Sequence, residues 1–418
     1  MGLAARVKKI LSIAGPGLIT GASDDDPSGL ATYTQAGAAF GFQMLWTALI
    51  TFPLMATIQG MCARIGLVTC QGLTGTIKQH YPRWLLYVLL LVSFPAIVLN
   101  IGADIESMAA VSHLLYPGVP MFAYSLFYAL LLIFLIIRLP YQRIASILKW
   151  LCIVLFLYLL VPFIVHVQWL QVLKNTVVPT VHFNKDFLNM LVAILGTTIS
   201  PYLFFWQATL EAEDVNVKQG GHILINKQVL GDMRKDVNGG MLFSNLVMFF
   251  IILTAGAVLF PHGIRQVDTI EQAAKALEPL TGKLTYVLFS IGVVGTGLLA
   301  VPVLAGSISY ITAETFDLPQ GLNKKLREAP VFYIVLTVSI LLGVCLNFSG
   351  ISPVKALIYT AVLYGLTAPV MIGVVMHIGN NKAIMGEHTN SVFSNVLGWI
   401  TLVFMTVAAV GLLWFMFV

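Results

Sequence analysis

The chain is a succession of long apolar runs separated by short polar connections. Runs such as "LLYVLLLVSF", "YALLLIFLIIRL" and "FYIVLTVSILLGV" carry almost no charge. A helix of roughly 20 apolar residues is long enough to cross the hydrocarbon core of a bilayer. The pattern predicts about eleven spans, at residues 10–39, 43–65, 85–113, 120–138, 147–168, 187–212, 238–261, 284–316, 331–348, 353–378 and 392–417. We therefore expect an all-α polytopic membrane protein.

Composition agrees with this pattern. Of the 418 residues, 58% are hydrophobic and 10% are charged, whereas an ordinary soluble domain carries roughly 25% charged residues. The four cysteines lie in or beside apolar segments without paired spacing, so we expect packing residues and neither a disulfide framework nor a zinc site. We expect one transmembrane domain over residues 1–418.

The charges predict an orientation. If the N-terminus is cytoplasmic, most of the 23 Lys and Arg residues fall in loops on that side, as the positive-inside rule requires. The C-terminus would then be extracytoplasmic. The basic termini and the absence of long sorting tails favour the inner (cytoplasmic) membrane of a bacterial cell.

The first apolar span contains the sequence "DDDPSG", residues 24–29. Proline inside a helix removes a hydrogen bond and clashes with the preceding turn, so we expect the helix to unwind beside Asp26 and Pro27. A carboxylate at membrane depth costs several kcal/mol and indicates a function by default. "GTTISPYLFFWQ" in the span at 187–212 predicts a second break at Ser200 and Pro201, although a proline kink without a ligand would explain that segment too.

The two predicted breaks fall in the first and the sixth span. Interrupted segments at matching places in two halves are typical of inverted-repeat transporters with a binding site near the bilayer midplane. Unwound backbone offers free carbonyl groups, which must bind something or face a cavity. Beside a carboxylate, we expect that ligand to be a cation.

Several segments resemble a known family. "GPGLITGASDDDPSGLATYTQAGAAFGF", "CARIGLVTCQGLTGTIKQHYPR", "GADIESMAA", "DTIEQAAKALEPLTG" and "NNKAIMGE" are similar, in this order, to segments of the Nramp (SLC11) divalent-metal transporters. The resemblance implies a LeuT-like five-plus-five inverted repeat with helices 1 and 6 broken. It places repeat one at about 10–168, repeat two at about 187–378 and an eleventh transmembrane helix at about 392–417. The fourth of these segments also has helical spacing and predicts a short extracellular surface helix.

The resemblance also implies a metal site, with departures. The family motif in span 1 is Asp-Pro-Gly-Asn; here Asp26 matches the metal-binding Asp, Pro27 the Pro, and Ser28 stands for the Gly. Gly29 stands for the Asn, so one side-chain oxygen ligand is missing.

The departures continue in span 6, where the family has Ala-x-x-Met-Pro-His. Thr197 stands for the Ala, Ser200 for the Met and Tyr202 for the first His, while Gln207 replaces a second family His. In span 10, Ala361 stands where the family has Gln. The thioether that favours softer transition metals is therefore absent, and an oxygen donor takes its place.

These changes share a chemical direction. Carboxylate, carbonyl, hydroxyl and water oxygens suit Mg²⁺, Ca²⁺ and Mn²⁺, and Mg²⁺ usually keeps several waters on one or two carboxylates. We expect Asp26, Gly29, Thr197 and Ser200 to surround a partly hydrated ion, with Gly29 leaving room for water. The pattern is most like the Nramp-related magnesium transporter branch, which predicts import of Mg²⁺, together with Mn²⁺, by alternating access.

Other polar residues are candidates for the pathway of the ion. Asp25 adjoins the metal-binding Asp; Asp104 matches one acid of the family in span 3, whereas the family Glu aligns with Ser107 and the nearby Glu106 points to a different face. Gln207 lies after the second break, and Glu211 is the acid nearest the membrane at that end of span 6. With no histidine at the aligned positions, we expect weak or absent proton coupling.

Alternatives remain open at this stage. The chain could be a proton-coupled Mn²⁺/Fe²⁺ transporter of the Nramp type, a non-transporting metal-sensing homologue, or an intramembrane aspartyl enzyme that uses Asp25, Asp26 or Asp104. We expect a transporter and not an enzyme, without a resident cofactor. Its expected partners are divalent metal ions and the lipid bilayer, with no nucleic acid and no obligate protein partner.

Overall fold

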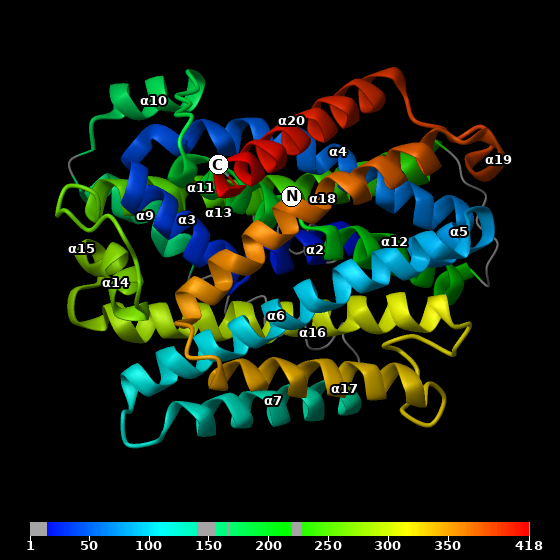
Figure 1. The fold of residues 1–418 in the computed structure, drawn as a ribbon, viewed down its shortest axis with the longest axis horizontal. Coiled ribbons are helices and arrows are strands. Elements are labelled where there is room, and N and C mark those ends of the chain that lie inside the picture. The colour runs from blue at the N-terminus through cyan, green and yellow to red at the C-terminus, as the bar shows by residue number, and fades with distance from the viewer. Residues whose placement is uncertain (1–14, 140–154, 166, 220–226, 418) are drawn as a thin grey trace, which may run out of the picture.

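A computed structural model describes residues 15–139, 155–165, 167–219 and 227–417. Within these ranges the chain forms helices and turns and contains no β-strand, and most helices lie along the longest axis of the molecule (Figure 1). The expected span at 147–168 falls partly outside the described residues.

The helices follow one another with short connections. In chain order they are α2 (Pro16–Asp24), α3 (Pro27–Phe40), η1 (Gly41–Met44), α4 (Leu45–Thr69), α5 (Leu73–His80), α6 (Arg83–Leu115), α7 (Met121–Arg138), α9 (Leu157–Ile164), α10 (Trp169–Val177), α11 (Lys185–Thr198), α12 (Pro201–Gln219), α13 (Lys227–Val258), α14 (Ile270–Ala274), η3 (Lys275–Leu277), α15 (Glu278–Thr281), η4 (Gly282–Leu284), α16 (Thr285–Thr315), α17 (Pro330–Val344), η5 (Cys345–Phe348), α18 (Pro353–Asn380), α19 (Lys382–Met385) and α20 (Val392–Phe417).

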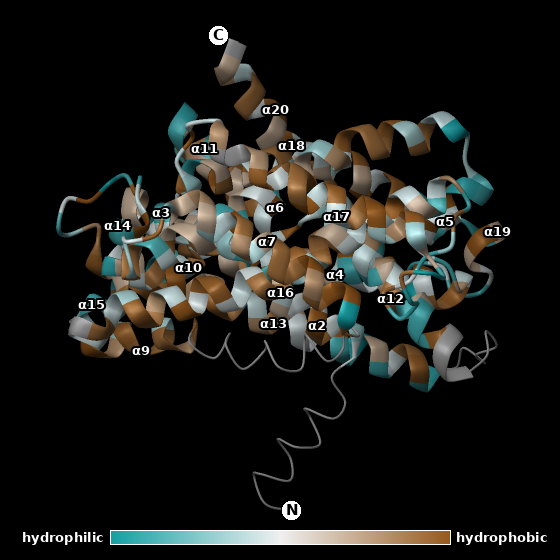
Figure 2. Cartoon of the chain, turned by 90° about the horizontal axis from the view of Figure 1, so that it is seen from below, coloured by the Kyte–Doolittle hydropathy of each residue, from teal (hydrophilic) through white to brown (hydrophobic). Residues whose placement is uncertain are grey.

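Eight helical segments of the described chain are long and apolar enough to cross a membrane. One of them joins α3 to α4, another joins α11 to most of α12, and α17 is a shorter apolar helix. Hydrophobic residues extend along the helices while hydrophilic residues gather at the two ends of the bundle (Figure 2). Large apolar side chains lie exposed on α6, α7, α17 and α20, on surfaces that lipid would cover. The polytopic membrane fold is confirmed, whereas the number of eleven spans stays a prediction.

The chain leaves the helical conformation at two places inside apolar segments. Asp25 and Asp26, here called the first interruption, separate α2 from α3, and Ile199 and Ser200, the second interruption, separate α11 from α12. In each case proline is the first residue of the next helix, where its fixed φ suits the helix and its missing N–H costs nothing. The residue before it is pushed toward extended backbone, and Asp26 indeed has φ −74° and ψ 174°.

Proline alone does not explain the interruptions. Pro53, Pro95 and Pro302 lie inside continuous helices α4, α6 and α16. At the first interruption, polar groups replace the lost helical hydrogen bonds, because the Asp26 side chain accepts from the backbone N–H of Gly29. The local sequence therefore both ends α2 and caps α3.

Helix α13 packs against α2, α3 and α4 and holds the first interruption in place. The contact is close because both helices present glycine: a Cβ on Gly21 would lie 2.3 Å from the carbonyl carbon of Gly240. Asp236 of α13 also caps α2, with Oδ1 accepting from the N–H of Gly15 at 3.0 Å and Oδ2 from that of Gly17 at 2.6 Å.

The bundle has two distinct ends in Figure 1. One, the α14 end, carries α10, α14 and α15; the other, the α5 end, carries α5 and α19. Residues 270–281, within the stretch that the spacing predicted to be helical, form α14, η3 and α15. The helical part of that prediction is confirmed, while its extracellular position stays a prediction. Ile270 and Ala273 of α14 are buried, because this short helix packs down onto the bundle.

Candidate metal site at the two helix interruptions

The two interruptions lie side by side, because Ser28 and Thr197, which flank them, are in contact although they are 169 positions apart. Ser28 Oγ lies 3.3 Å from Thr197 Oγ1, and one turn further along α3 the Tyr33 hydroxyl lies 3.2 Å from Thr198 Oγ1. All four side chains are buried. The polar residues of the two interruptions thus form one buried polar centre inside an apolar bundle.

Asp26 is the charged group of this centre and is only 2% exposed. Its Oδ1 accepts from the N–H of Gly29 at 2.8 Å, and its Oδ2 accepts from Asn100 Nδ2 at 3.0 Å. Both donors are neutral, and Asp26 takes part in none of the ion pairs between described residues. Each carboxylate oxygen can accept more than one bond, so a cation can still bind and would supply the missing charge.

Asn100 of α6 is a site residue that the sequence analysis missed. Its amide nitrogen donates to Asp26, and its Oδ1 lies 3.0 Å from the hydroxyl of Thr360 on α18, which can donate to it or to the carbonyl oxygen of Leu357 at 2.7 Å. These two bonds fix the orientation of the Asp26 carboxylate from two further helices. The available signal was spacing, because Asn100 lies one helical turn before Asp104 and therefore on the same face.

Ser200 is positioned by the carbonyl groups that the second interruption releases. Its hydroxyl lies 3.0 Å from the carbonyl oxygen of Gly196 and 2.8 Å from that of Thr197, to which it can donate. The sequence led us to expect free carbonyl groups at this interruption. The Thr197 carbonyl is instead shared with the Ser200 hydroxyl and is not wholly free. The Ser200 oxygen keeps its lone pairs and remains a possible hard ligand.

Gly29 does not simply open a space for water. A Cβ on this residue would lie 3.2 Å from Cε2 of Tyr33 and 3.5 Å from the carbonyl oxygen of Asp24. Because Tyr33 is one turn further along the same helix, its ring covers the position that a longer side chain would occupy.

Asp24 and Asp25 turn toward α13. The hydroxyl of Ser244 lies 2.6 Å from Asp24 Oδ2 and 3.2 Å from Asp25 Oδ1. Both aspartates are buried, and one oxygen of each has no hydrogen-bond partner. The predicted pathway residue Asp25 is therefore next to Asp26 in sequence but has a different polar partner, Ser244, which the sequence analysis did not single out.

The remaining predicted pathway residues separate into three places. Asp104 is fully buried on the Asn100 face of α6, and within the described part of the chain neither of its carboxylate oxygens has a hydrogen-bond partner. Glu106 is buried on the same helix, two positions further on. Gln207 donates from Nε2 to Glu211 Oε1 at 3.0 Å, one turn apart on α12, so these two form a separate pair toward the α5 end.

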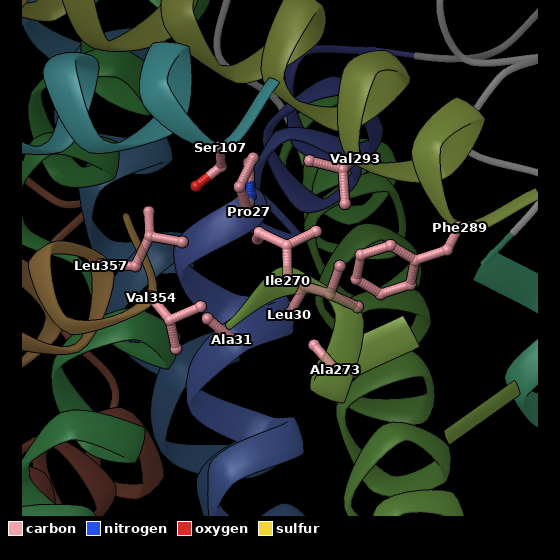
Figure 3. Close-up of a pocket in the computed structure, with 10 residues that line it drawn as sticks. All are labelled: Pro27, Leu30, Ala31, Ser107, Ile270, Ala273, Phe289, Val293, Val354 and Leu357. Carbon is pink, nitrogen blue, oxygen red and sulfur yellow. The ribbon is translucent and has the colours of Figure 1, made fainter. Parts of the chain in front are cut away.

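The α14 side of the site is closed by apolar packing. Figure 3 shows Pro27 and Leu30 meeting Ile270 of α14 and Phe289 of α16 around a small cavity. That cavity measures ≈ 10 Å³, about the space of a single water molecule. A hydrated ion therefore cannot pass this way in the present arrangement.

The α5 end is more open and more polar. A cavity of ≈ 300 Å³ lies between α5, α12 and α16 and is lined by Glu213 and Glu314 among other polar groups. Glu314 Oε2 accepts from the N–H of Gly75 at 2.8 Å, and Lys78 pairs with Asp317 at 2.6 Å. The acids that line this cavity are Glu213, Glu314 and Asp317, while Glu211 is not among its lining residues.

Comparison with known proteins places the chain in a family. Residues 17–415 match the family model described as "Nramp: Natural resistance-associated macrophage protein-like". A protein called divalent metal cation transporter MntH from Klebsiella pneumoniae (strain 342) is 26% identical over 411 residues, which cover 95% of this chain and 92% of that protein. Its counterpart from Caldanaerobacter subterraneus subsp. tengcongensis is 24% identical over 404 residues, covering 95% and 91%.

Solved structures share the fold. The manganese transporter of Eremococcus coleocola, crystallised with an aromatic bis-isothiourea substituted compound, superposes with a TM-score of 0.74 at 19% identity, over 99% of this chain and 88% of that one. The inward-facing conformation of Mhp1, a LeuT-fold protein, gives a TM-score of 0.52 at 11% identity, over 96% and 90%. The expected LeuT-like fold is thereby confirmed, while the repeat boundaries stay predictions. Because the family model covers nearly the whole chain, the protein belongs to the Nramp family, a family of membrane transporters and not of enzymes.

Proposed function

We propose that this protein is a divalent-cation transporter that imports Mg²⁺, and Mn²⁺ as well, across the cytoplasmic membrane. In this proposal the ion moves partly hydrated, by alternating access and with weak or no proton coupling. The N-terminus would be cytoplasmic and the C-terminus extracytoplasmic, so that the α5 end faces the cell interior.

The observation that carries the proposal is the setting of Asp26. This buried carboxylate lies at the junction of two interrupted helices and receives only neutral donors, from Gly29 and Asn100. A buried charge without a charged partner costs several kcal/mol, and a bound cation removes that cost. The chain's membership of a family whose relatives are called divalent metal cation transporters supports the same conclusion.

The donor atoms support a hard ion. Asp26 offers carboxylate oxygen, and Ser200 and Thr197 offer hydroxyl or carbonyl oxygen on the facing interruption. Oxygen ligands suit Mg²⁺ and Mn²⁺, and a site with one or two carboxylates leaves Mg²⁺ part of its water shell.

The two ends of the molecule support alternating access. The α14 side is sealed by apolar contacts, whereas an acidic cavity lies at the α5 end. Rocking α2, α3, α11 and α12 against the other helices would open one side while closing the other.

Calorimetry of the purified protein with Mg²⁺ and with Mn²⁺ tests the proposal. Asp26→Asn is the informative variant, because asparagine caps a helix as well as aspartate does and so preserves the contact with Gly29 while removing the charge. We expect the wild type to bind both ions and Asp26→Asn and Asp26→Ala to bind neither measurably.

Two results would contradict it. Retained Mg²⁺ binding in Asp26→Asn would show that this carboxylate is not the ligand. Binding of Mn²⁺ and Fe²⁺ at micromolar concentration with no response to Mg²⁺ would instead favour a transition-metal transporter.

A further inference from the structure

Asp104 and Tyr364 are buried polar side chains that the site as described so far does not use. Asp104 is 0% exposed and Tyr364 is 2% exposed. Both carboxylate oxygens of Asp104 and the hydroxyl of Tyr364 lack a hydrogen-bond partner among the described residues. Buried polar atoms are nearly always satisfied, so three unsatisfied atoms in one region indicate that a ligand or its water belongs there.

These two residues extend the contacts of Asp26. Asp104 lies one turn after Asn100 on α6, and Tyr364 lies one turn after Thr360 on α18. Asn100 and Thr360 are bonded to each other, and Asn100 is bonded to Asp26. Residues four apart share a helix face, so Asp104 and Tyr364 face the same polar centre from its two sides.

The opposite directions of α6 and α18 bring the side chains of Asp104 and Tyr364 toward the same height along the bundle. Helices α6 and α18 pack against each other and run in opposite directions (Figure 1). Side chains on a helix lean toward its N-terminus, so Asp104 and Tyr364 lean toward each other. The ring of Tyr202, 5.5 Å from that of Tyr364 between centroids, braces the tyrosine from α12.

The spacing suits a water-mediated contact with the ion. Mg²⁺ binds its waters at about 2.0–2.1 Å, and each water donates a hydrogen bond at about 2.7–2.8 Å, so a group that holds those waters lies about 4–5 Å from the ion. One helical turn separates the Cβ atoms of Asn100 and Asp104 by about 5–6 Å. An ion bound at Asp26 is therefore within reach of Asp104 through one water.

We propose that Asp104 and Tyr364 form the outer half of the cation site, which holds the water shell of an ion whose direct ligand is Asp26. The Asp104 carboxylate accepts hydrogen bonds from two of the ion's waters, and the Tyr364 hydroxyl binds a third. This inference rests on the proposed function and names the form in which the ion is recognised, a divalent cation that keeps part of its hydration shell.

The test compares Mg²⁺ with Mn²⁺ by calorimetry in Asp104→Asn and Tyr364→Phe. Mg²⁺ gives up its waters reluctantly and so depends on groups that hold them, whereas Mn²⁺ exchanges them for direct ligands more easily. Loss of outer partners typically weakens metal affinity 10–100-fold, so we expect Mg²⁺ to bind about tenfold more weakly in each variant and Mn²⁺ to change less. The ratio of the dissociation constant for Mg²⁺ to that for Mn²⁺ should therefore rise in both variants.

Tyr128→Phe is the matched control, because the hydroxyl of Tyr128 bonds Ser112 on the α7 side of α6, away from the site. It should leave the ratio at its wild-type value. Thermal unfolding of each variant shows whether it is folded, and the Tyr364→Phe change, which removes one unpaired hydroxyl, keeps the test valid if Asp104→Asn is unstable.

The outcomes separate this inference from the proposed function. If the wild type binds Mg²⁺ but the ratio is unchanged in either folded variant, the water-holding role is wrong while the function stands. If the wild type does not bind Mg²⁺, both are wrong.

Discussion

Asp26 has two roles that compete for the same oxygens. Without a cation it caps α3 through Gly29 and accepts from Asn100, which keeps a buried charge tolerable inside the bundle. In the proposed function the same oxygens would become ligands of the cation. Because neutral donors stabilise the carboxylate only partly, the cap would organise the site without removing the affinity for a positive ion that we propose.

The hydrogen bonds that orient Asp26 should differ in their contribution to stability. Asn100→Ala removes the bonds to both Asp26 and Thr360 and leaves a buried carboxylate oxygen unpaired, so we expect the free energy of unfolding to fall by about 1–3 kcal/mol. Thr360→Ala removes one bond between neutral groups and should cost only about 1 kcal/mol. Unfolding of the two variants in detergent, followed by temperature or denaturant, measures the difference. A larger loss in Thr360→Ala would show that Asn100 is not the residue that orients the carboxylate.

The oxygen of Ser200 should determine which metals bind well. Replacing it with methionine puts a thioether beside Asp26, and thioether ligands favour softer metals. We expect Ser200→Met to weaken Mg²⁺ binding more than Mn²⁺ binding, because a thioether is a poor ligand for the harder ion. Ser200→Ala, which removes the hydroxyl without adding sulfur, serves as the control, and competition between the two ions in calorimetry is the measurement. If the methionine and alanine variants show the same preference, sulfur is not close enough to bind.

At the scale of elements, glycine contacts hold α2 and α3 against α13. A Cβ on Gly240 would lie 2.2 Å from the carbonyl oxygen of Gly17, and one on Gly37 would lie 2.4 Å from that of Ile252. Backbone in such contact cannot yield to a larger residue by rotating a side chain. The position of the first interruption therefore depends on glycines several turns from the metal site.

Two adjacent glycines of α13 test this dependence. Gly240→Ala forces α2 away from α13 and should lower the free energy of unfolding by about 1–3 kcal/mol, as overpacking does, with a loss of Mg²⁺ affinity. Gly239→Ala is the matched control, since nothing lies within 4 Å of its Cβ; alanine there should be neutral or stabilise the helix by up to about 1 kcal/mol. Equal stability of the two variants would mean that the close approach of α2 and α13 does not hold the site.

At the scale of the whole molecule, the membrane potential is a sufficient driving force. A single charge gains about 2.3 kcal/mol per 100 mV, so a divalent ion gains about 4.6 kcal/mol per 100 mV without any proton. Tyr202 and Gln207, which the family resemblance aligns with histidines, are not side chains that titrate near neutral pH. The whole transporter should therefore work as a voltage-driven carrier.

Liposomes containing the protein and a pH-sensitive dye test this. We expect Mg²⁺ influx to rise with an inside-negative potassium diffusion potential, with no acidification above that of protein-free liposomes. Liposomes that contain Asp26→Asn give the background for flux. Acidification that follows metal uptake at fixed voltage would show proton coupling.

Apolar spacing and the two Asp-Pro and Ser-Pro sequences were enough to predict an all-helical membrane fold with interruptions beside Asp26 and Ser200. The partners of the acids could not be predicted in this way. Asn100 is 74 positions from Asp26, and Ser244 is 220 positions from Asp24, and contacts at such separations depend on how helices pack. The ring of Tyr33 beside Gly29 was missed for a local reason, since the side-chain rotamer decides whether it covers the glycine.

The cap that Asp236 provides to α2 has a consequence for movement. The start of α2 has no capping side chain of its own, so its first amide groups are satisfied by a carboxylate from α13. If α2 moves away from α13, the hydrogen bonds from the amides of Gly15 and Gly17 to the Asp236 carboxylate break. All three groups must then be hydrated. Separation should cost little where water reaches these groups and much in hydrocarbon, so in the proposed transport cycle the Asp236 contact would break only at an end of the bundle that is open to water.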